Sequence, residues 1–210
     1  MHLTVEQPGR SATMTVLEDR IAMADADANN LSLDEWFERL ERMPVPEGYR
    51  VEIVGGNVYM TPQRSTHWGI IRRIVRALED RFGMDAAVFS DVRIDFPGHD
   101  NGFCPDVALL KDVAEEDDRG HWRYQDVEFV AEVISQGTAA NDYGPKRLAY
   151  AEAEVPVYLI ADPYQGRCHV HTDPKDGDYT TCTRVDFGTD VDLTGTVVDL
   201  VLVTEDFPRD

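Results

Sequence analysis

Two acidic residues interrupt segments that otherwise have the apolar pattern of buried strands. Asp106 lies in NGFCPDVALL and Glu132 lies in DVEFVAEVIS. A charged side chain in such a segment costs several kcal/mol unless it is paired or ligates a metal. Two acids on two core strands therefore predict a site for a divalent cation. The leading hypothesis for its chemistry is metal-dependent hydrolysis of a phosphodiester.

Hydrolysis of a phosphodiester needs a cation that polarises the phosphate and lowers the pKa of the attacking water. Mg²⁺ takes oxygen ligands at about 2.0–2.1 Å, so a few carboxylates and a backbone carbonyl are enough. We expect Asp106 and Glu132 to supply two ligands and the carbonyl of Val133 to supply another. Glu52 is a further candidate, although its pattern alone is typical of an exposed strand carboxylate.

Other polar residues have spacings that allow more than one interpretation. His67 opens a predicted helix, where by itself it is typical of an ordinary polar residue at a helix start. Asp142 and Lys146 are four residues apart and share a face if both are helical, as a solvent-exposed ion pair also would. His169 and His171 alternate onto one strand face and could bind zinc, but no third ligand has suitable spacing. The last pattern therefore favours a polar sheet face.

The apolar periodicity indicates which elements position these residues in the first part of the chain. Ser32 and Glu35 form a capping box at the start of a helix that Pro44 ends. The segments 49–54 and 57–60 flank Gly55-Gly56, which predicts a β-hairpin. Apolar residues at helical spacing predict a helix over 67–82, with an apolar face made of Trp68, Ile71, Ile74, Val75, Leu78 and Phe82.

The second part of the chain is dominated by strand patterns. Strands are predicted at 88–96, 103–110, 127–134 and 155–162, and at 167–173, 179–187 and 196–203. A helix is predicted over 141–153, starting close to Tyr143 or Gly144 because Pro145 is tolerated only in a first turn. The fold class is mixed α/β (α+β), with a central mixed sheet flanked by helices. We expect residues 1–30 to be a flexible segment and residues 31–210 to form a single domain.

The charge limits the kinds of partner that the protein can have. A net charge of −20 argues against a dedicated, high-affinity nucleic-acid binder, which usually has a basic surface. The clear basic stripe is Arg72, Arg73 and Arg76 on one helix, and these are the candidates for contacts with a nucleic-acid backbone. No apolar run has the roughly 18 residues of a membrane helix, and no signal pattern is present, so we expect a cytoplasmic protein without a membrane partner.

The order and spacing of several motifs resemble the Uma-two family, restriction-endonuclease-like proteins within the PD-(D/E)XK nuclease superfamily. The resemblance covers roughly residues 30 to 172. It rests on Glu52 before a Gly-rich hairpin, His67 opening a helix, Pro105-Asp106-Val107, Glu132-Val133-x-Ser135, Asp142 with Lys146, Tyr150-Ala151, Val155-Pro156-x-Tyr158-Leu159 and Asp162-Pro163.

This resemblance implies a nuclease core, Mg²⁺ or Mn²⁺ on acids from adjacent strands, and hydrolysis of nucleic acid, DNA above all. Asp106 matches the motif aspartate and Glu132 the motif acid. Ile134 stands where the superfamily has a lysine, and Lys146 in the following helix matches that lysine. Glu52 matches the early acid that completes the metal site.

One departure from the family pattern leaves other functions open. The segment 135–141 (SQGTAAN) has no proline and no arginine, whereas the family commonly has Ser-Pro-Ser-Thr and then basic residues there. The alternative is a catalytically weak or inactive homodimeric interaction or regulatory module on the same fold. Apolar residues such as Trp36 and Phe37 could serve a dimer interface or the core equally well. A third hypothesis is a hydrolase of small phosphoesters.

Overall fold

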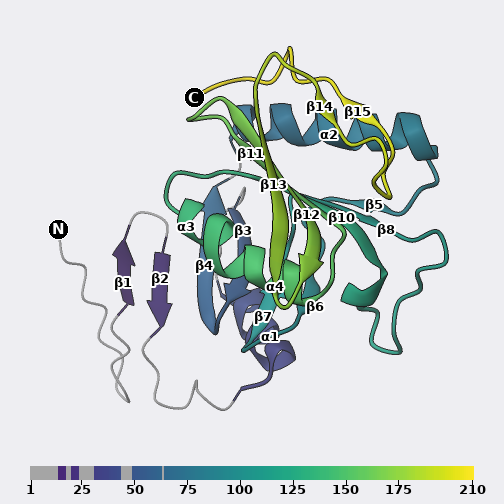
Figure 1. Ribbon diagram of the computed structural model, residues 1–210. Helices are drawn as coiled ribbons and strands as arrows, with labels where there is room; N and C mark the ends of the chain where they lie inside the picture. Colours follow the sequence, from purple (N-terminus) through teal and green to yellow (C-terminus); the bar gives the residue numbers. More distant parts are fainter. Residues whose placement is uncertain (1–13, 18–19, 24–30, 44–48, 63) are drawn as a thin grey trace, which may run out of the picture.

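The structure, a computed structural model, describes residues 14–17, 20–23, 31–43, 49–62 and 64–210 (Figure 1). Most of the predicted flexible segment 1–30 lies outside these residues. Within it, β1 (Met14–Leu17) and β2 (Arg20–Met23) form an antiparallel pair that the sequence did not predict. The prediction of a single domain over 31–210 stays a prediction.

A seven-stranded sheet contains the hairpin that carries Glu52. Its strand order is β1-β2-β4-β3-β7-β6-β9. The remaining strands are β3 (Tyr49–Val54), β4 (Asn57–Pro62), β6 (Ile94–Phe96), β7 (Asn101–Phe103) and β9 (Trp122–Arg123). Gly55 and Gly56 have φ of 56° and 73°, and positive values at both positions are what a tight two-residue hairpin requires. The predicted hairpin is therefore confirmed.

A six-stranded sheet carries the other two acids, and its strand order is β13-β12-β11-β10-β8-β5. Its strands are β5 (Val88–Phe89), β8 (Val107–Leu110), β10 (Val127–Val133), β11 (Val157–Asp162), β12 (Arg167–Lys175) and β13 (Asp178–Asp186). Strands β10 and β11 are parallel, and the other pairs of this sheet are antiparallel. A 3-10 turn, η2 (Tyr124–Asp126), precedes β10. The mixed α/β fold class is confirmed.

Helices cover both faces of the six-stranded sheet (Figure 1). On one face, α2 (Ser65–Phe82) packs through a stripe formed by Ile70, Ile71, Ile74 and Leu78. The predicted apolar face is wrong at Trp68, whose side chain is 54% exposed. The stripe that packs on the sheet is rotated toward Ile70, so the first turn directs His67 inward instead.

The opposite face is covered by a helical segment with an unusual middle. It consists of α3 (Ala139–Asn141), a π-helical turn η3 (Asp142–Lys146) and α4 (Arg147–Glu152). The predicted start near Tyr143 is therefore wrong, because the helix begins at Ala139. Pro145 lies inside it, and the wider π turn accommodates a ring that lacks an N–H and crowds the preceding turn.

Three predicted strands differ from the structure. The segment 103–110 is not one strand, because Phe103 ends β7 and β8 begins only at Val107 in the other sheet, so Asp106 lies just before the strand that was predicted to carry it. The segment 88–96 is not one strand, because Asp91 has a φ of 58° and separates β5 from β6, which join different sheets. The segment 196–203 forms a strand only at β15 (Val201–Leu202), which pairs with β14 (Val191–Asp192) beside α2.

The first helix, α1 (Leu33–Glu41), begins with the predicted capping box of Ser32 and Glu35. It packs on the hairpin, and Trp36 lies in a buried cluster with Leu40, Ile53 and Val58. Core packing thus accounts for the burial of Trp36.

Gly102 on β7 tests the packing of this layer. A Cβ at that position would lie 2.6 Å from Cε2 of Phe37, whose ring is also covered by the guanidinium of Arg93 at 4.1 Å. We expect Gly102→Ala to lower the free energy of unfolding by about 1–3 kcal/mol, measured by urea denaturation.

Gly144→Ala is the matched control, because a Cβ there meets no atom within 4 Å. Its stability should stay equal or rise slightly, since alanine restricts the unfolded chain. Equal effects of the two substitutions would contradict the packing argument.

Candidate active site

The structure brings five of the predicted site residues together in one buried cluster. Glu52 lies on β3, Asp106 directly precedes β8, and Glu132 lies on β10. His67 lies in the first turn of α2, and Lys146 ends the π-helical turn. All five side chains are buried, those of Asp106 and Glu132 almost completely.

Asp106 is held in its ionised form by three neighbours. Its Oδ2 accepts a hydrogen bond from the amide of Val133 at 2.7 Å, and Nε2 of His67 lies 2.9 Å from its Oδ1. Arg50 donates to Oδ1 as well. Burial raises the pKa of Asp106, but Arg50, His67 and the Val133 amide outweigh it and hold that pKa below its usual range. Since this carboxylate is ionised, His67 carries its proton on Nε2.

The alternation of β10 predicts that Glu132 shares a face with Val130 and Ile134. The structure agrees, since Val130 and Ile134 pack in the same apolar cluster as Tyr150, which Glu132 contacts. Oε1 of Glu132 accepts a hydrogen bond from the hydroxyl of Tyr150 at 2.6 Å. The same oxygen lies 2.6 Å from Nζ of Lys146. Burial raises the pKa of Glu132 to about 8 despite this lysine, and the nearby charge of Asp106 contributes.

Lys146 contacts three carboxylates from within the protein. Its Nζ lies 2.6 Å from Glu132, 2.9 Å from Glu52 and 3.1 Å from Asp142. Burial lowers the pKa of Lys146, but the three carboxylates raise it well above its usual value. Burial raises the pKa of Asp142 to about 6 against the effect of Lys146. The interpretation of Asp142 and Lys146 as a solvent-exposed pair is therefore wrong, because the π turn faces the sheet.

Glu52 is buried, so the interpretation of this residue as an exposed carboxylate is also wrong. Sequence reasoning missed its neighbour Arg50, whose side chain is 7% exposed and contacts the predicted metal ligands. A signal was present, since residues two apart on a strand share a face. Once Glu52 is placed in the site, Arg50 must point there too.

The cluster contains more carboxyl groups than cationic side chains. Four buried carboxylates (Glu52, Asp106, Glu132 and Asp142) face two permanent cations, Arg50 and Lys146. Oε1 of Glu52 is buried and accepts no hydrogen bond, although Lys146 lies near it. With all four carboxyl groups ionised, the cluster has two negative charges in excess, and oxygen donors with this charge fit a hard divalent cation such as Mg²⁺ or Mn²⁺. Binding of a metal favours the ionised form of its ligands, Glu132 included. The carbonyl of Val133 as a ligand stays a prediction.

Another acidic group was not predicted. Within the described part of the chain, Asp34, Asp95 and His121 have ligand atoms that all lie within 4.8 Å of one another. Arg93 binds both carboxylates, at 2.8 Å from Asp34 and 2.7 Å from Asp95, and Arg119 lies 3.0 Å from Asp34. These half-buried acids therefore already have cationic partners.

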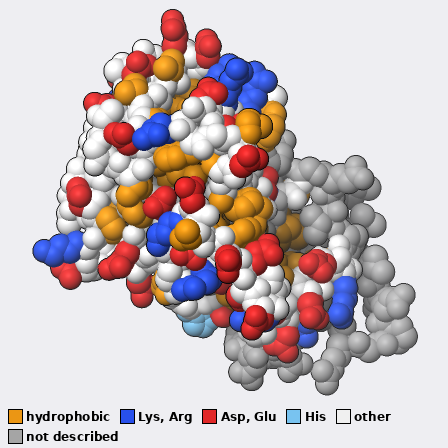
Figure 2. Space-filling model, turned by 90° about the vertical axis from the view of Figure 1, so that its right-hand side faces the viewer, with side chains coloured by type: hydrophobic (Ala, Val, Ile, Leu, Met, Phe, Trp, Pro, Cys, Tyr) orange, Lys and Arg blue, Asp and Glu red, His pale blue; other side chains and the backbone are white. Residues whose placement is uncertain are grey.

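The predicted nucleic-acid contacts lie on α2, away from its buried stripe. Arg72 and Arg76 are exposed, and Arg73 donates to the carbonyl of Gly69. No contact among the described residues links these arginines to the carboxylate cluster. On the face shown in Figure 2, Lys and Arg side chains form separate groups interspersed with acidic ones.

The histidine pair on β12 has aromatic neighbours. His169 packs edge-on against Tyr143, and His171 stacks on Tyr158. Among the described residues, neither belongs to a group of three potential metal ligands. Both side chains are buried against these rings, so this strand face is not the polar sheet face that the spacing favoured.

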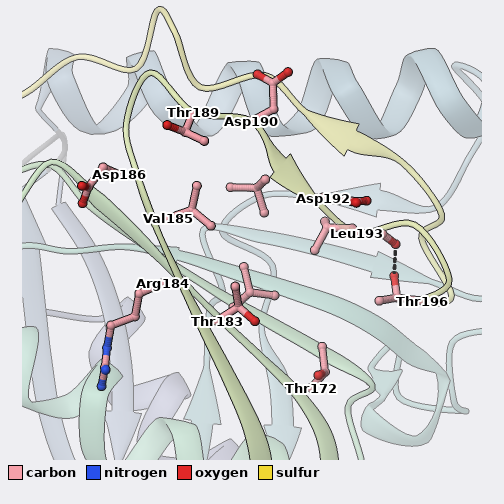
Figure 3. A pocket seen from close by; sticks show the side chains of 12 residues that line it. Thr172, Thr183, Arg184, Val185, Asp186, Thr189, Asp190, Asp192, Leu193 and Thr196 are labelled. Carbon is pink, nitrogen blue, oxygen red and sulfur yellow. Dashed lines mark hydrogen bonds between the residues drawn. The ribbon is translucent and has the colours of Figure 1, made fainter.

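A separate pocket of about 420 Å³ lies between β12–β13 and the segment 189–196. Threonine, valine and charged side chains line it (Figure 3), and none of the predicted site residues is among them.

The arrangement of acids and a lysine on a mixed sheet between helices defines a nuclease-like α/β protein. The family model of Uma2, described as "Putative restriction endonuclease", matches residues 37–204. The chain therefore belongs to this family. No curated protein matches the sequence.

A solved structure supports the fold. It is a crystal structure of "a putative nuclease belonging to DUF820" from Anabaena variabilis, with a TM-score of 0.64 and 16% identity. The alignment covers 84% of this chain and 97% of the other.

Lys146→Met tests the charge balance of the cluster. The substitution leaves three buried carboxylates without their shared cation, and removing one partner of a buried ion pair costs about 3–5 kcal/mol. We expect the free energy of unfolding, measured by urea denaturation without divalent cations, to decrease by this amount.

The control is Arg42→Met, because Arg42 forms an exposed pair with Glu38. Exposed pairs contribute little, so the midpoint should hardly move. A change in the Lys146 variant as small as that of the control would contradict the role assigned to this lysine.

Proposed function

We propose that the chain is a Mg²⁺- or Mn²⁺-dependent endonuclease that hydrolyses phosphodiester bonds of DNA. The observation that carries the proposal is the buried cluster, in which four carboxylates face only two permanent cations. Membership in a family of restriction-endonuclease-like proteins supports the same chemistry. The cytoplasmic location and the homodimer stay predictions.

Asp106, Glu132 and Glu52, with the carbonyl of Val133, would hold the divalent cation. The bound cation would polarise the phosphate and lower the pKa of the attacking water. The protein's own part is to keep these oxygens together in an environment that excludes water, where charge interactions are strong. The Val133 amide and Tyr150 fix one oxygen each on Asp106 and Glu132.

Lys146 and His67 are the candidates for handling the water and the developing charge. Lys146 bears a permanent positive charge beside Glu132 and Glu52, where it orients water or stabilises the pentavalent transition state. His67 places its Nε2 proton beside Asp106, where it assists proton transfer or positions a phosphate. Asp91, whose side chain is 39% exposed, lies 3.4 Å from Arg50 of the cluster.

Asp106→Asn and Glu132→Gln test the metal site with little change of shape. We expect both variants to lose Mn²⁺ binding in calorimetry and Mn²⁺-dependent nicking of a supercoiled plasmid, because each removes a charged ligand. Circular dichroism checks that the fold is retained.

Asp34→Asn is the matched control, since it removes a carboxylate from the other acidic group. It should keep nicking unchanged. Equal nicking by the wild type and both site variants, purified in parallel, would contradict the proposal. Binding without nicking in the wild type would favour the inactive interaction module.

The arginines of α2 are proposed to contact the DNA backbone. Replacing Arg72, Arg73 and Arg76 by glutamine should weaken DNA binding, measured by fluorescence anisotropy without divalent cations. The plot of log binding constant against log salt concentration has a negative slope, and its magnitude should decrease by about 0.9 for each lost arginine that contacts a phosphate of B-DNA. The exposed Arg42→Gln should leave the slope unchanged. A triple variant with the slope of the wild type would exclude these contacts.

A further inference from the structure

Among the residues that the structure describes, Arg50 is the one cation that contacts all three predicted acidic ligands of the metal. Its Nη2 lies 3.3 Å from Glu52, its Nη1 lies 3.8 Å from Glu132, and Nη1 also donates to Asp106. Oxygens that a metal would use are therefore engaged by a guanidinium.

The guanidinium is held by charge more than by complete hydrogen bonding. Nη1 also donates to the carbonyl of Cys104 at 3.1 Å, but the buried Nε has no hydrogen-bond partner. An arginine buried in a site made for it normally uses its fixed fork of donors. In Arg50 the Nε donor makes no hydrogen bond, and the attraction of the adjacent carboxylates offsets the cost of burying it.

A divalent cation and this guanidinium compete for the same oxygens. Both are positive, and like charges a few ångströms apart in a buried site repel strongly. Arg50 has a partner nearer to solvent, because Asp91 lies 3.4 Å from Nη1 and its side chain is partly exposed. The guanidinium can therefore move toward Asp91 while it leaves the other carboxylates to a metal.

We propose that Arg50 is an internal counter-ion that keeps the metal ligands together and competes with the divalent cation for them, so that it sets the metal affinity of the site. The inference rests on the proposed function, since it needs a metal at Asp106 and Glu132. Arg50 is thus a positioning residue that acts through the ligands and not on the substrate.

The test is calorimetric titration of Mn²⁺ into Arg50→Gln and Arg50→Lys, both made in an Asp34→Asn protein in which the other acidic group is disabled. This Asp34→Asn protein is the parent with which the variants are compared. Arg50→Gln should bind Mn²⁺ at least about tenfold more tightly than the parent, because the competing charge is gone. Arg50→Lys retains the charge and should stay close to the parent. Arg167→Gln, which breaks an ion pair with Asp186 on β12 and β13, is the control and should leave the affinity unchanged.

Thermal unfolding provides the second measurement. Without metal, Arg50→Gln should melt at a lower temperature than the parent, and Mn²⁺ should raise its melting temperature more than that of the parent. A variant that stays unfolded in the presence of Mn²⁺ contradicts the exchange of one cation for the other.

The outcomes separate the two proposals. Equal or weaker Mn²⁺ binding by Arg50→Gln, with binding and nicking intact in the parent, overturns the role of Arg50 and leaves the nuclease standing. Binding gained by the variant over a weakly binding parent supports the role of Arg50. Absence of Mn²⁺ binding in every protein overturns both.

Discussion

One buried cluster in the described part of the chain holds four carboxyl groups with two permanent cations among them, and this imbalance is the constraint on which the site depends. At about 4 Å, two like charges repel by roughly 4 kcal/mol at an effective dielectric of 20. Several elements of the fold bring cations or hydrogen-bond donors to these carboxylates and so offset the repulsion. Strand β3 delivers both Glu52 and Arg50, and the amide of Val133 binds Asp106. A π turn directs Lys146 toward three acids instead of solvent.

The two acids on the six-stranded sheet are treated differently by this environment. Asp106 has Arg50, His67 and an amide, which hold its pKa below the usual range and keep it negative. Glu132 has Lys146 and a tyrosine hydroxyl, yet burial still raises its pKa to about 8. Pairs of acids whose pKa values are pushed apart are common where chemistry is done. Structural ion-pair networks produce the same pattern, so direct metal titration, rather than the pKa values, discriminates between the two.

Most of the fold and of the site could be predicted, since local signals carry both. The capping box, the Gly55-Gly56 hairpin and the long basic helix follow from turn chemistry and periodicity. Spacing alone gave the wrong environment for Glu52 and Lys146, because alternation on a strand and an i, i+4 pair on a helix look the same on a buried and on an exposed face. The family resemblance grouped both residues with Asp106 and Glu132, and in the structure Lys146 lies beside Glu52 and Glu132; their roles stay predictions. Arg50 was missed because arginine on a short strand is normally exposed. The break at Asp91 and the π turn at Pro145 arise from backbone conformations that hydrophobic periodicity does not encode.

The commitment of the internal cations has a consequence for how an acidic protein could meet an acidic substrate. Arg50 and Lys146 both lie against carboxylates, so most of their charge is already balanced before a phosphate binds. The protein as a whole carries a net charge of −20, and electrostatic steering toward DNA is unfavourable outside local basic patches such as that of α2. In the proposed function, a bound divalent cation would supply further positive charge at the cluster. The metal would then have an electrostatic role before any chemical one, because it would allow a phosphate to bind at an acidic site.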